Sequence, residues 1–140
     1  MTRRLLAHVD DDDAIAYLLD RALRNSGLTD WDIKYFSSSD SALNYLTKAK
    51  SEQGKLPDLM VLDLRMPGMD GLELLEWATS NVPDVPAVML SSSELLRDQL
   101  QARDLGSKGY FLKSPGFAEL LEFLRGWEET VLARRSSQAT

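Results

Sequence analysis

Four short apolar segments of the chain each end at a polar side chain that can take part in chemistry. They are Arg4–Val9 before Asp10, Asp58–Leu62 before Asp63, Ala87–Leu90 before Ser91, and Tyr110–Leu112 before Lys113. A carboxylate can act as a nucleophile toward phosphorus, and its oxygens also suit a hard cation such as Mg²⁺. Lysine and serine side chains can bind phosphoryl oxygens. If these segments are neighbouring strands, their ends form a plausible phosphoryl-transfer site.

Carboxylates dominate this set, because Asp10 begins a run of four consecutive aspartates. Like charges that meet raise one another's pKa unless a positive charge intervenes. A site that combines this run with Asp63 therefore needs a cation, which a metal ion or Lys113 could supply. A run of aspartates before a helix can also cap it and complement its dipole. We expect Asp12 or Asp13 to have that role.

Strands and helices that alternate along the chain must position these side chains. Trp31–Phe36 alternates apolar and polar residues as a strand does. The stretches between the strands carry apolar residues at helical spacing. The predicted helices are Ala14–Asn25, Ser38–Lys50, a helix from Gly71 through Trp77, Ser93–Leu105 and Gly116–Leu132. We expect Ser38 or Ser39 to cap the second of these, and a serine from positions 91–93 to cap the fourth.

Five strand–helix units with no internal repeat and no linker predict a single α/β domain. Right-handed crossovers between such units give a parallel sheet with helices on both faces. Ligands of these sheets bind beyond the carboxyl ends of the strands. The polar residues that follow the strands are therefore expected at one edge of the sheet, where chemistry is to be sought.

The composition limits the class of protein. A chain of 140 residues can bury a core, and the absence of cysteine excludes disulfides and thiolate metal sites. The formal net charge is −6, from 22 acidic and 16 basic residues, and no basic cluster favours nucleic-acid binding. No apolar stretch has the length of a membrane helix or a signal peptide. We expect a soluble, cytoplasmic protein that binds neither nucleic acid nor membranes.

Four segments in order carry a family resemblance: HVDDDD, VLDLRMPGMDG, VMLSS and GYFLKSP. They resemble the signature segments of the response-regulator receiver family, of which CheY is the familiar member, and the resemblance covers about Leu5 to Trp127. It implies a flavodoxin-like (βα)5 fold, an α/β doubly wound parallel sheet with strand order 2-1-3-4-5. We expect a receiver domain over residues 1–133 and a flexible C-terminal tail over residues 134–140.

The resemblance also implies roles for the acidic residues. Asp63 corresponds to the carboxylate that accepts a phosphoryl group in this family. Asp10 and Asp11 correspond to the acidic pair that binds Mg²⁺ together with Asp63, with Asp11 touching the ion and Asp10 acting mainly through water. The backbone carbonyl of Arg65 would complete the protein's share of the metal ligands.

The resemblance also implies roles for three further residues. Ser91 replaces the commoner threonine as the hydroxyl near the phosphoryl group, and Lys113 matches the phosphate-binding lysine. Tyr110 matches an aromatic side chain that changes position on activation. The family usually has Lys-Pro with a cis bond, whereas here Ser114 separates Lys113 from Pro115. The geometry of this loop is therefore left open by the sequence.

The implied function is that of a two-component response regulator rather than an enzyme. A sensor histidine kinase or phosphotransfer protein would phosphorylate Asp63. His8, the only histidine, is expected in the core. Because little chain follows Trp127, we expect no output domain. Signalling would pass to a downstream protein through the face made by the fourth helix, fifth strand and fifth helix, which is also where a homodimer could form. The loop Ser51–Pro57 resembles that of single-domain regulators paired with phytochrome-type kinases.

Two other functions fit part of the pattern. A receiver fold that binds partners without being phosphorylated is favoured only by the serine between Lys113 and Pro115. An aspartate phosphatase of the haloacid-dehalogenase type is suggested by Asp10-x-Asp12 after a strand, although that family's continuation is absent. A flavodoxin is a poorer match, because four aspartates would repel the flavin phosphate.

Overall fold

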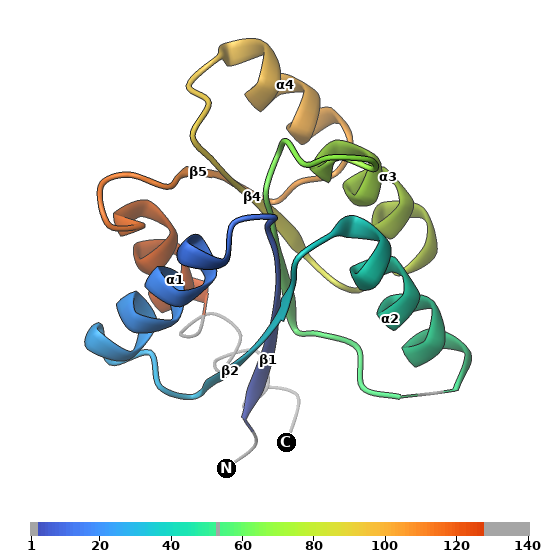
Figure 1. Ribbon diagram of the computed structural model, residues 1–140, viewed down its shortest axis with the longest axis horizontal. Coiled ribbons are helices and arrows are strands. Elements are labelled where there is room, and N and C mark those ends of the chain that lie inside the picture. Colours follow the sequence, from blue (N-terminus) through green and yellow to red (C-terminus); the bar gives the residue numbers. More distant parts are fainter. Residues whose placement is uncertain (1–2, 53, 128–140) are drawn as a thin grey trace, which may run out of the picture.

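The computed structural model describes residues 3–52 and 54–127 and contains a five-stranded parallel sheet in the order β2-β1-β3-β4-β5. The strands are β1 (Arg4–Val9), β2 (Trp31–Phe36), β3 (Leu59–Leu62), β4 (Ala87–Ser91) and β5 (Tyr110–Leu112). The helices are α1 (Asp13–Asn25), α2 (Ser39–Ser51), α3 (Gly71–Asn81), α4 (Leu96–Asp104) and a C-terminal helix over residues 118–127. The predicted α/β fold and its strand order are confirmed (Figure 1).

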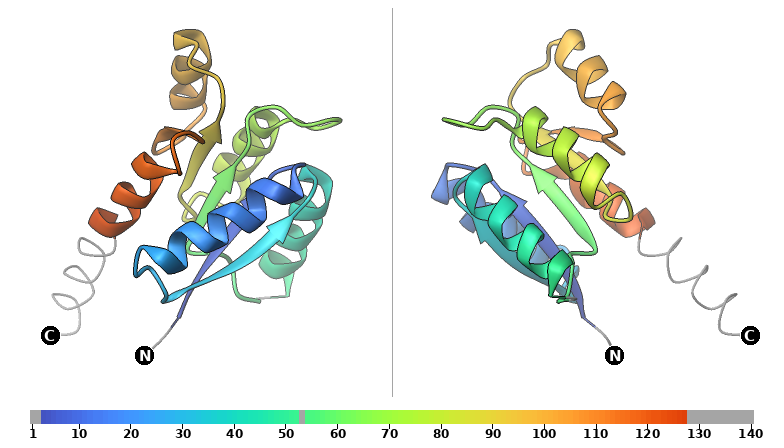
Figure 2. Two further views of the ribbon diagram at one scale, coloured as in Figure 1. Left: turned by 60° about the vertical axis from the view of Figure 1, so that its left-hand side comes forward. Right: turned by 90° about the vertical axis from the view of Figure 1, so that its right-hand side faces the viewer.

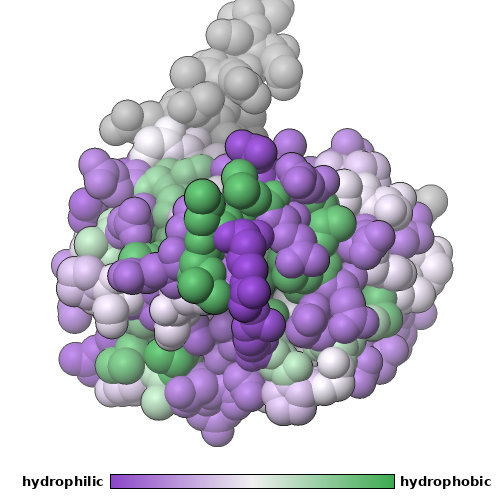
Figure 3. Space-filling model, turned by 90° about the horizontal axis from the view of Figure 1, so that it is seen from above, coloured by the Kyte–Doolittle hydropathy of each residue, from purple (hydrophilic) through white to green (hydrophobic). Residues whose placement is uncertain are grey.

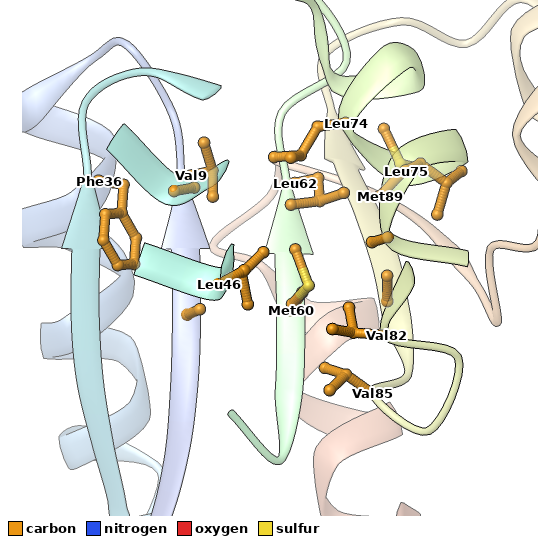
Figure 4. Packing of buried hydrophobic residues seen from close by; sticks show 14 of the residues in the cluster. Val9, Phe36, Leu46, Met60, Leu62, Leu74, Leu75, Val82, Val85 and Met89 are labelled. Carbon is orange, nitrogen blue, oxygen red and sulfur yellow. The ribbon is translucent and has the colours of Figure 1, made fainter. Parts of the chain in front are cut away.

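The helices cover both faces of the sheet and enclose two hydrophobic clusters. Helices α1 and 118–127 lie on one face, and α2 and α3 lie on the other (Figures 1 and 2). Successive residues of β3 alternate between the clusters, because strand side chains point to opposite faces. Met60 and Leu62 pack with α2 and α3, as Figure 4 shows, whereas Leu59 and Val61 pack toward α1 and the C-terminal helix. All residues of β3 are buried, as its continuously apolar sequence predicts.

Two of the predicted helix caps are confirmed. Asp12 caps α1 by accepting a hydrogen bond from the backbone N–H of Ala14, and Ser38 caps α2 by accepting one from Ser41. The predictions offered two residues for each cap, and the backbone determines which is used. The capping residue is extended in both cases, so its side-chain oxygen can reach back over the first turn.

The prediction of a serine-capped fourth helix starting at Ser93 is wrong. Helix α4 begins at Leu96, and its N-cap residue Leu95 makes no side-chain capping bond. The Ser93 hydroxyl instead accepts a hydrogen bond from the backbone N–H of Leu95 and donates one to Asp98. A serine bonded to the backbone two residues ahead favours a turn over helix, so the helix starts later.

The C-terminal helix also starts later than predicted, because Gly116 and Phe117 both have positive φ angles, 54° and 60°, and form a turn. The part of this predicted helix after Trp127, and the tail predicted for residues 134–140, lie outside the described residues. Trp127 packs against Trp31 with ring centroids 5.3 Å apart. The buried guanidinium of Arg4 lies over both rings, with its Cζ 5.8 Å from the Trp31 centroid and 6.0 Å from the Trp127 centroid. This side chain of β1 therefore packs against the C-terminal helix.

The loop after β3 closes tightly because Gly71, the first residue of α3, approaches the backbone of Asp63. Its N–H donates to the Leu64 carbonyl at 3.0 Å. A Cβ atom at position 71 would overlap the Asp63 carbonyl oxygen. The N-cap of this helix, Asp70, accepts a hydrogen bond from the backbone N–H of Glu73. The absence of a side chain at Gly71 therefore determines how close α3 comes to the end of β3.

Gly71→Ala is expected to lower the free energy of unfolding by about 1–3 kcal/mol, because the added methyl group must displace backbone rather than a flexible side chain. Chemical denaturation measures the change. Gly126→Ala is the matched control: that glycine lies in the C-terminal helix facing open space, so the substitution should stabilise by up to about 1 kcal/mol. Equal effects of the two substitutions would contradict this account of Gly71.

Candidate functional site

The carboxylates of Asp10, Asp11 and Asp63 meet at the carboxyl ends of two neighbouring strands. Val9 and Leu62 are partners in the β1–β3 pairing, so the residues that follow them are adjacent, and the Asp63 N–H donates to the Val9 carbonyl at 2.9 Å. One oxygen from each of the three carboxylates lies within 4.8 Å of the others. Asp10 is fully buried and Asp63 is 7% exposed, whereas Asp11 is exposed. The structure thus brings together the three acidic residues that the sequence singled out.

Lys113 crosses β4 to reach both buried carboxylates. Its Nζ lies 2.9 Å from Asp10 Oδ2 and 3.2 Å from Asp63 Oδ1. Its backbone N–H donates to the Ser91 carbonyl, which anchors the start of the β5 loop. The sequence offered Lys113 as a cation for a site that combines the aspartate run with Asp63, and in the structure Asp10 is the nearer of its two partners. One ammonium group therefore faces two buried negative charges.

Burial and the neighbouring charges shift the pKa values of Asp63 and Lys113. Burial, with the charge of Asp10, raises the pKa of Asp63 to about 6, against the opposing effect of Lys113. Burial alone would lower the pKa of Lys113, but its hydrogen bond to Asp10 and the charge of Asp63 outweigh this and raise it. Lys113 therefore stays charged at neutral pH, and the pocket keeps an excess of negative charge that one lysine does not neutralise.

His8 lies in the core beneath the acidic pocket, as expected. It is fully buried, with Nε2 3.9 Å from Asp10 Oδ2. Burial, opposed by the charge of Asp10 and aided by that of Lys113, lowers the pKa of His8 to about 4. The imidazole is therefore neutral at neutral pH. It is not among the residues that group with Asp10, Asp11 and Asp63 in the described part of the chain.

Ser91 and Arg65 line an open cavity beside Asp63. The cavity has a volume of about 440 Å³, and its lining is Asp63, Arg65, Ser91, Ser92, Ser93 and Lys113. The Ser91 hydroxyl oxygen accepts a hydrogen bond from the Ser93 backbone N–H at 3.0 Å. The hydroxyl of Ser91 is thereby held by the β4–α4 loop at the rim of the cavity. Serine hydroxyls and cationic side chains, which can bind phosphoryl oxygens, therefore line the cavity beside the Asp63 carboxylate.

A hydrogen-bonded network continues from this cavity to helix α4. Asp98, which is 3% exposed, accepts hydrogen bonds from Ser93 Oγ at 2.6 Å and from the guanidinium of Arg65 at 3.2 Å. The Ser93 hydrogen bond, aided by Arg65, holds the pKa of Asp98 below its usual range. The Tyr110 hydroxyl donates to the Ser93 carbonyl at 2.9 Å. The network thus links the loop after β3, the start of α4 and the start of β5.

Two residues of the site region were missed by sequence reasoning. Asp98 lies within an amphipathic helix, where an aspartate usually faces solvent, and only tertiary packing buries it. Tyr35 belongs to β2, and the polar residues that the sequence singled out all follow other strands. Its hydroxyl donates to the Asp10 carbonyl at 2.7 Å and lies 3.2 Å from Asp13 Oδ1. Burial, with the hydrogen bond to Asp13, raises the pKa of Tyr35 to about 12. The alternation of β2 gave no hint of this contact.

The structure gives the geometry of the loop after Lys113, which the sequence left open. Its cis peptide bond lies between Ser114 and Pro115, one position after the lysine. The ammonium group of Lys113 still reaches the acidic pocket. The additional residue therefore leaves the charge of the site in place.

Comparison with known proteins identifies the family. The chain matches the response regulator receiver domain model over residues 6–125. It belongs to the response-regulator receiver family. Receivers are phosphoacceptor signalling modules of two-component systems, served by a cognate histidine kinase, and are not enzymes in the usual sense. Membership in this family also excludes the aspartate phosphatase and flavodoxin hypotheses.

Individual relatives agree with this assignment. The DNA-binding transcriptional regulator NtrC of Klebsiella pneumoniae is 34% identical over 113 residues, which is 81% of this chain but only 22% of that protein. The phosphorylated cyanobacterial phytochrome response regulator RcpA is 29% identical, with a TM-score of 0.76 over 94% of this chain and 96% of that one. The Mn²⁺-bound response regulator Rcp1 is 26% identical, with a TM-score of 0.72 over 89% and 91%.

The chain spans about a fifth of the length of NtrC, so the activity of that whole protein is not transferred to this receiver. Among the helices of residues 3–52 and 54–127, none has the length and apolar character needed to cross a bilayer.

Asp63→Asn is expected to stabilise the metal-free protein at neutral pH. The pKa of Asp63 is about 6 in the folded state against 3.8 in the unfolded chain, so folding favours the protonated carboxyl. The ionised form therefore costs stability above that range, and the cost vanishes as the pH falls through it. Solvent screening at the open cavity reduces the gain to about 1–2 kcal/mol.

Chemical denaturation with a chelator present, at several pH values, measures this difference. Asp104→Asn serves as the control, because Asp104 is an exposed carboxylate at the end of α4. A stability gain from Asp63→Asn that is the same at acidic and neutral pH would contradict the role assigned to the carboxylate's charge.

Proposed function

We propose that Asp63 accepts a phosphoryl group from a phosphohistidine of the cognate kinase or of a phosphotransfer protein. The observation that carries this proposal is the meeting of Asp10, Asp11 and Asp63 with the ammonium of Lys113 beside an open cavity. RcpA, a relative that aligns over nearly the whole chain, is described as phosphorylated. The acceptor residue is assigned by its place at the end of β3.

A divalent cation, Mg²⁺ under cellular conditions, fits the pocket. The available ligands are all oxygen atoms, which hard cations prefer, and the carboxylates carry more charge than Lys113 balances. Asp11 and Asp63 would bind it directly, Asp10 would act mainly through water, and the Arg65 backbone carbonyl would complete the protein ligands. When bound, the cation supplies positive charge that draws phosphoryl oxygens toward the carboxylates. Rcp1 is described in a Mn²⁺-bound form.

The transfer itself forms one bond and breaks one. An oxygen of the Asp63 carboxylate attacks phosphorus, and the P–N bond to the donor histidine breaks, with its electron pair returning to the imidazole nitrogen. The nucleophile must be ionised, and Lys113 at 3.2 Å favours that state against burial. As the phosphoryl group arrives, Lys113 can exchange a carboxylate contact for a phosphoryl oxygen, and the Ser91 hydroxyl can donate to another.

Signalling would pass from Ser91 to the α4–β5 surface. The Ser91 hydroxyl accepts a hydrogen bond from the backbone N–H of Ser93, and the Ser93 carbonyl accepts one from the Tyr110 hydroxyl. Movement of Ser91 toward a phosphoryl group would therefore shift the Tyr110 hydroxyl and the start of α4, a two-state change biased by local charge. The protein would present this surface to a downstream protein or to a second copy of itself.

The α4–β5 surface has the character of a binding face. A cavity of about 460 Å³ lies there, lined by Leu96, Gln99, Leu100, Arg103, Ser107, Lys108, Gly109 and Tyr110. Leu95 and Leu96 are 50% and 66% exposed. Seen from the end of the sheet that carries the site, hydrophobic groups gather beside strongly hydrophilic ones (Figure 3). Tyr110 belongs both to this cavity and to the network of Ser93, so the two regions are in direct contact.

Incubation with acetyl phosphate and Mg²⁺ should add the mass of one phosphoryl group to the intact protein, and a chelator should prevent it. Asp63→Asn should abolish the addition because the nucleophile is lost. Lys113→Met should slow it by about 10²-fold, since a preorganised charge at the transferred group is removed. Intact-mass spectrometry over time measures each rate.

Asp12→Asn is the matched control, because Asp12 belongs to the same acidic run but caps α1 and lies outside the carboxylate group of the pocket. It should be phosphorylated at the wild-type rate. A wild-type protein that gains no phosphoryl mass, or mass that persists in Asp63→Asn, would favour a receiver that binds partners without being phosphorylated.

A further inference from the structure

Tyr35, near the end of β2, contacts the loop that carries the acidic pair. It pairs with His8 in the β1–β2 register, two residues before Asp10. Its hydroxyl donates to the backbone carbonyl of Asp10 at 2.7 Å. The same hydroxyl lies 3.2 Å from Asp13 Oδ1. One side chain from β2 thus contacts both ends of the β1–α1 loop.

Two hydrogen bonds to β2 hold the backbone of Asp10, one at its N–H and one at its carbonyl. The Asp10 N–H donates to the Phe36 carbonyl at 3.1 Å, and the Asp10 carbonyl accepts from Tyr35. Both backbone groups of Asp10 are therefore bonded to β2. Since the Asp10 carbonyl belongs to the peptide unit that leads to Asp11, its orientation determines where the exposed Asp11 carboxylate begins. Asp11 itself lies in the pocket group although solvent surrounds it.

The acidic run divides into two sets, and the Tyr35 hydroxyl contacts one member of the set outside the pocket. Asp10 and Asp11 join Asp63 in the pocket, whereas Asp13 is bonded to Tyr35 and Asp12 caps α1. A third or fourth carboxylate from this run in the pocket would add repulsion that a single divalent ion does not offset. The position of Asp13 on the β2 side keeps its charge away from the other two.

We infer that Tyr35 is a positioning residue for the divalent-cation site, acting by orienting the Asp10–Asp11 peptide through its hydroxyl. This inference rests on the proposed function of the pocket and adds to it a residue outside the predicted ligands. The hydroxyl touches no ligand atom of the ion. Its effect on cation affinity comes from how well the Asp11 carboxylate is placed before the ion arrives.

Tyr35→Phe is expected to weaken Mg²⁺ binding roughly three- to tenfold, the effect of losing one hydrogen bond that organises the site. Isothermal titration calorimetry on the full chain, with MgCl₂ as titrant, measures the dissociation constant. Tyr17→Phe is the matched control, because the Tyr17 hydroxyl is on α1, is largely exposed and bonds only to Arg21 among the contacts described for it. It should bind Mg²⁺ as the wild type does.

A second comparison separates the two contacts of the hydroxyl. Asp13→Asn removes the charge near Tyr35 but leaves the bond to the Asp10 carbonyl. Tyr35→Phe should therefore weaken Mg²⁺ binding by the same factor in the Asp13→Asn background as in the wild type. A loss confined to the background that retains Asp13 would overturn the assigned route through the Asp10 peptide.

The free energy of unfolding of Tyr35→Phe, measured with a chelator present, distinguishes a positioning role of Tyr35 from a general effect on stability. A Tyr35→Phe protein that is less stable but binds Mg²⁺ within twofold of the wild type would overturn the inference and leave the proposed function intact. A wild-type protein that binds no Mg²⁺ would instead refute the proposed metal site, and the inference with it. Weaker binding by the folded Tyr35→Phe variant, with unchanged binding by Tyr17→Phe, supports it.

Discussion

Two buried carboxylates from neighbouring strands, Asp10 and Asp63, share the ammonium group of Lys113. Removing such charges from water is costly, and the cost is tolerated because β1, β3 and β5 all end at the same edge of the sheet. The pairing leaves excess negative charge and a carboxylate whose pKa is raised to about 6. Attraction for a cation and reactivity toward phosphorus both follow from this unbalanced arrangement.

Contacts with the surrounding backbone and side chains hold the residues of the pocket in place. Gly71 lets α3 approach the Asp63 backbone, and the β2 residue Tyr35 holds the Asp10 carbonyl. On the opposite side, Asp98 joins the Arg65 guanidinium to the Ser93 hydroxyl. Hydrogen bonds therefore connect the loop that carries Asp63 to α4, and contiguous contacts of this kind can transmit a local change of charge to a distant surface.

Sequence reasoning was most accurate where one local interaction decides the structure. The continuously apolar β3 and the caps at Asp12 and Ser38 follow from burial and from backbone hydrogen bonding within a few residues. It failed at the start of α4, where Ser93 could cap a helix or form a turn. The choice depends on Asp98, a buried partner whose burial requires the packed protein. Periodicity does not report such a partner.

The order of residues along the chain was enough to show which side chains stand at strand ends and that the signature segments resemble a receiver. Strand alternation and turn chemistry act over a few residues, so they can be read directly. How far Lys113 reaches, its second partner Asp10, and the contact of Tyr35 with the acidic loop could not be read in that way. These contacts join residues from different strands, and their distances exist only once the twisted sheet has brought those strands side by side.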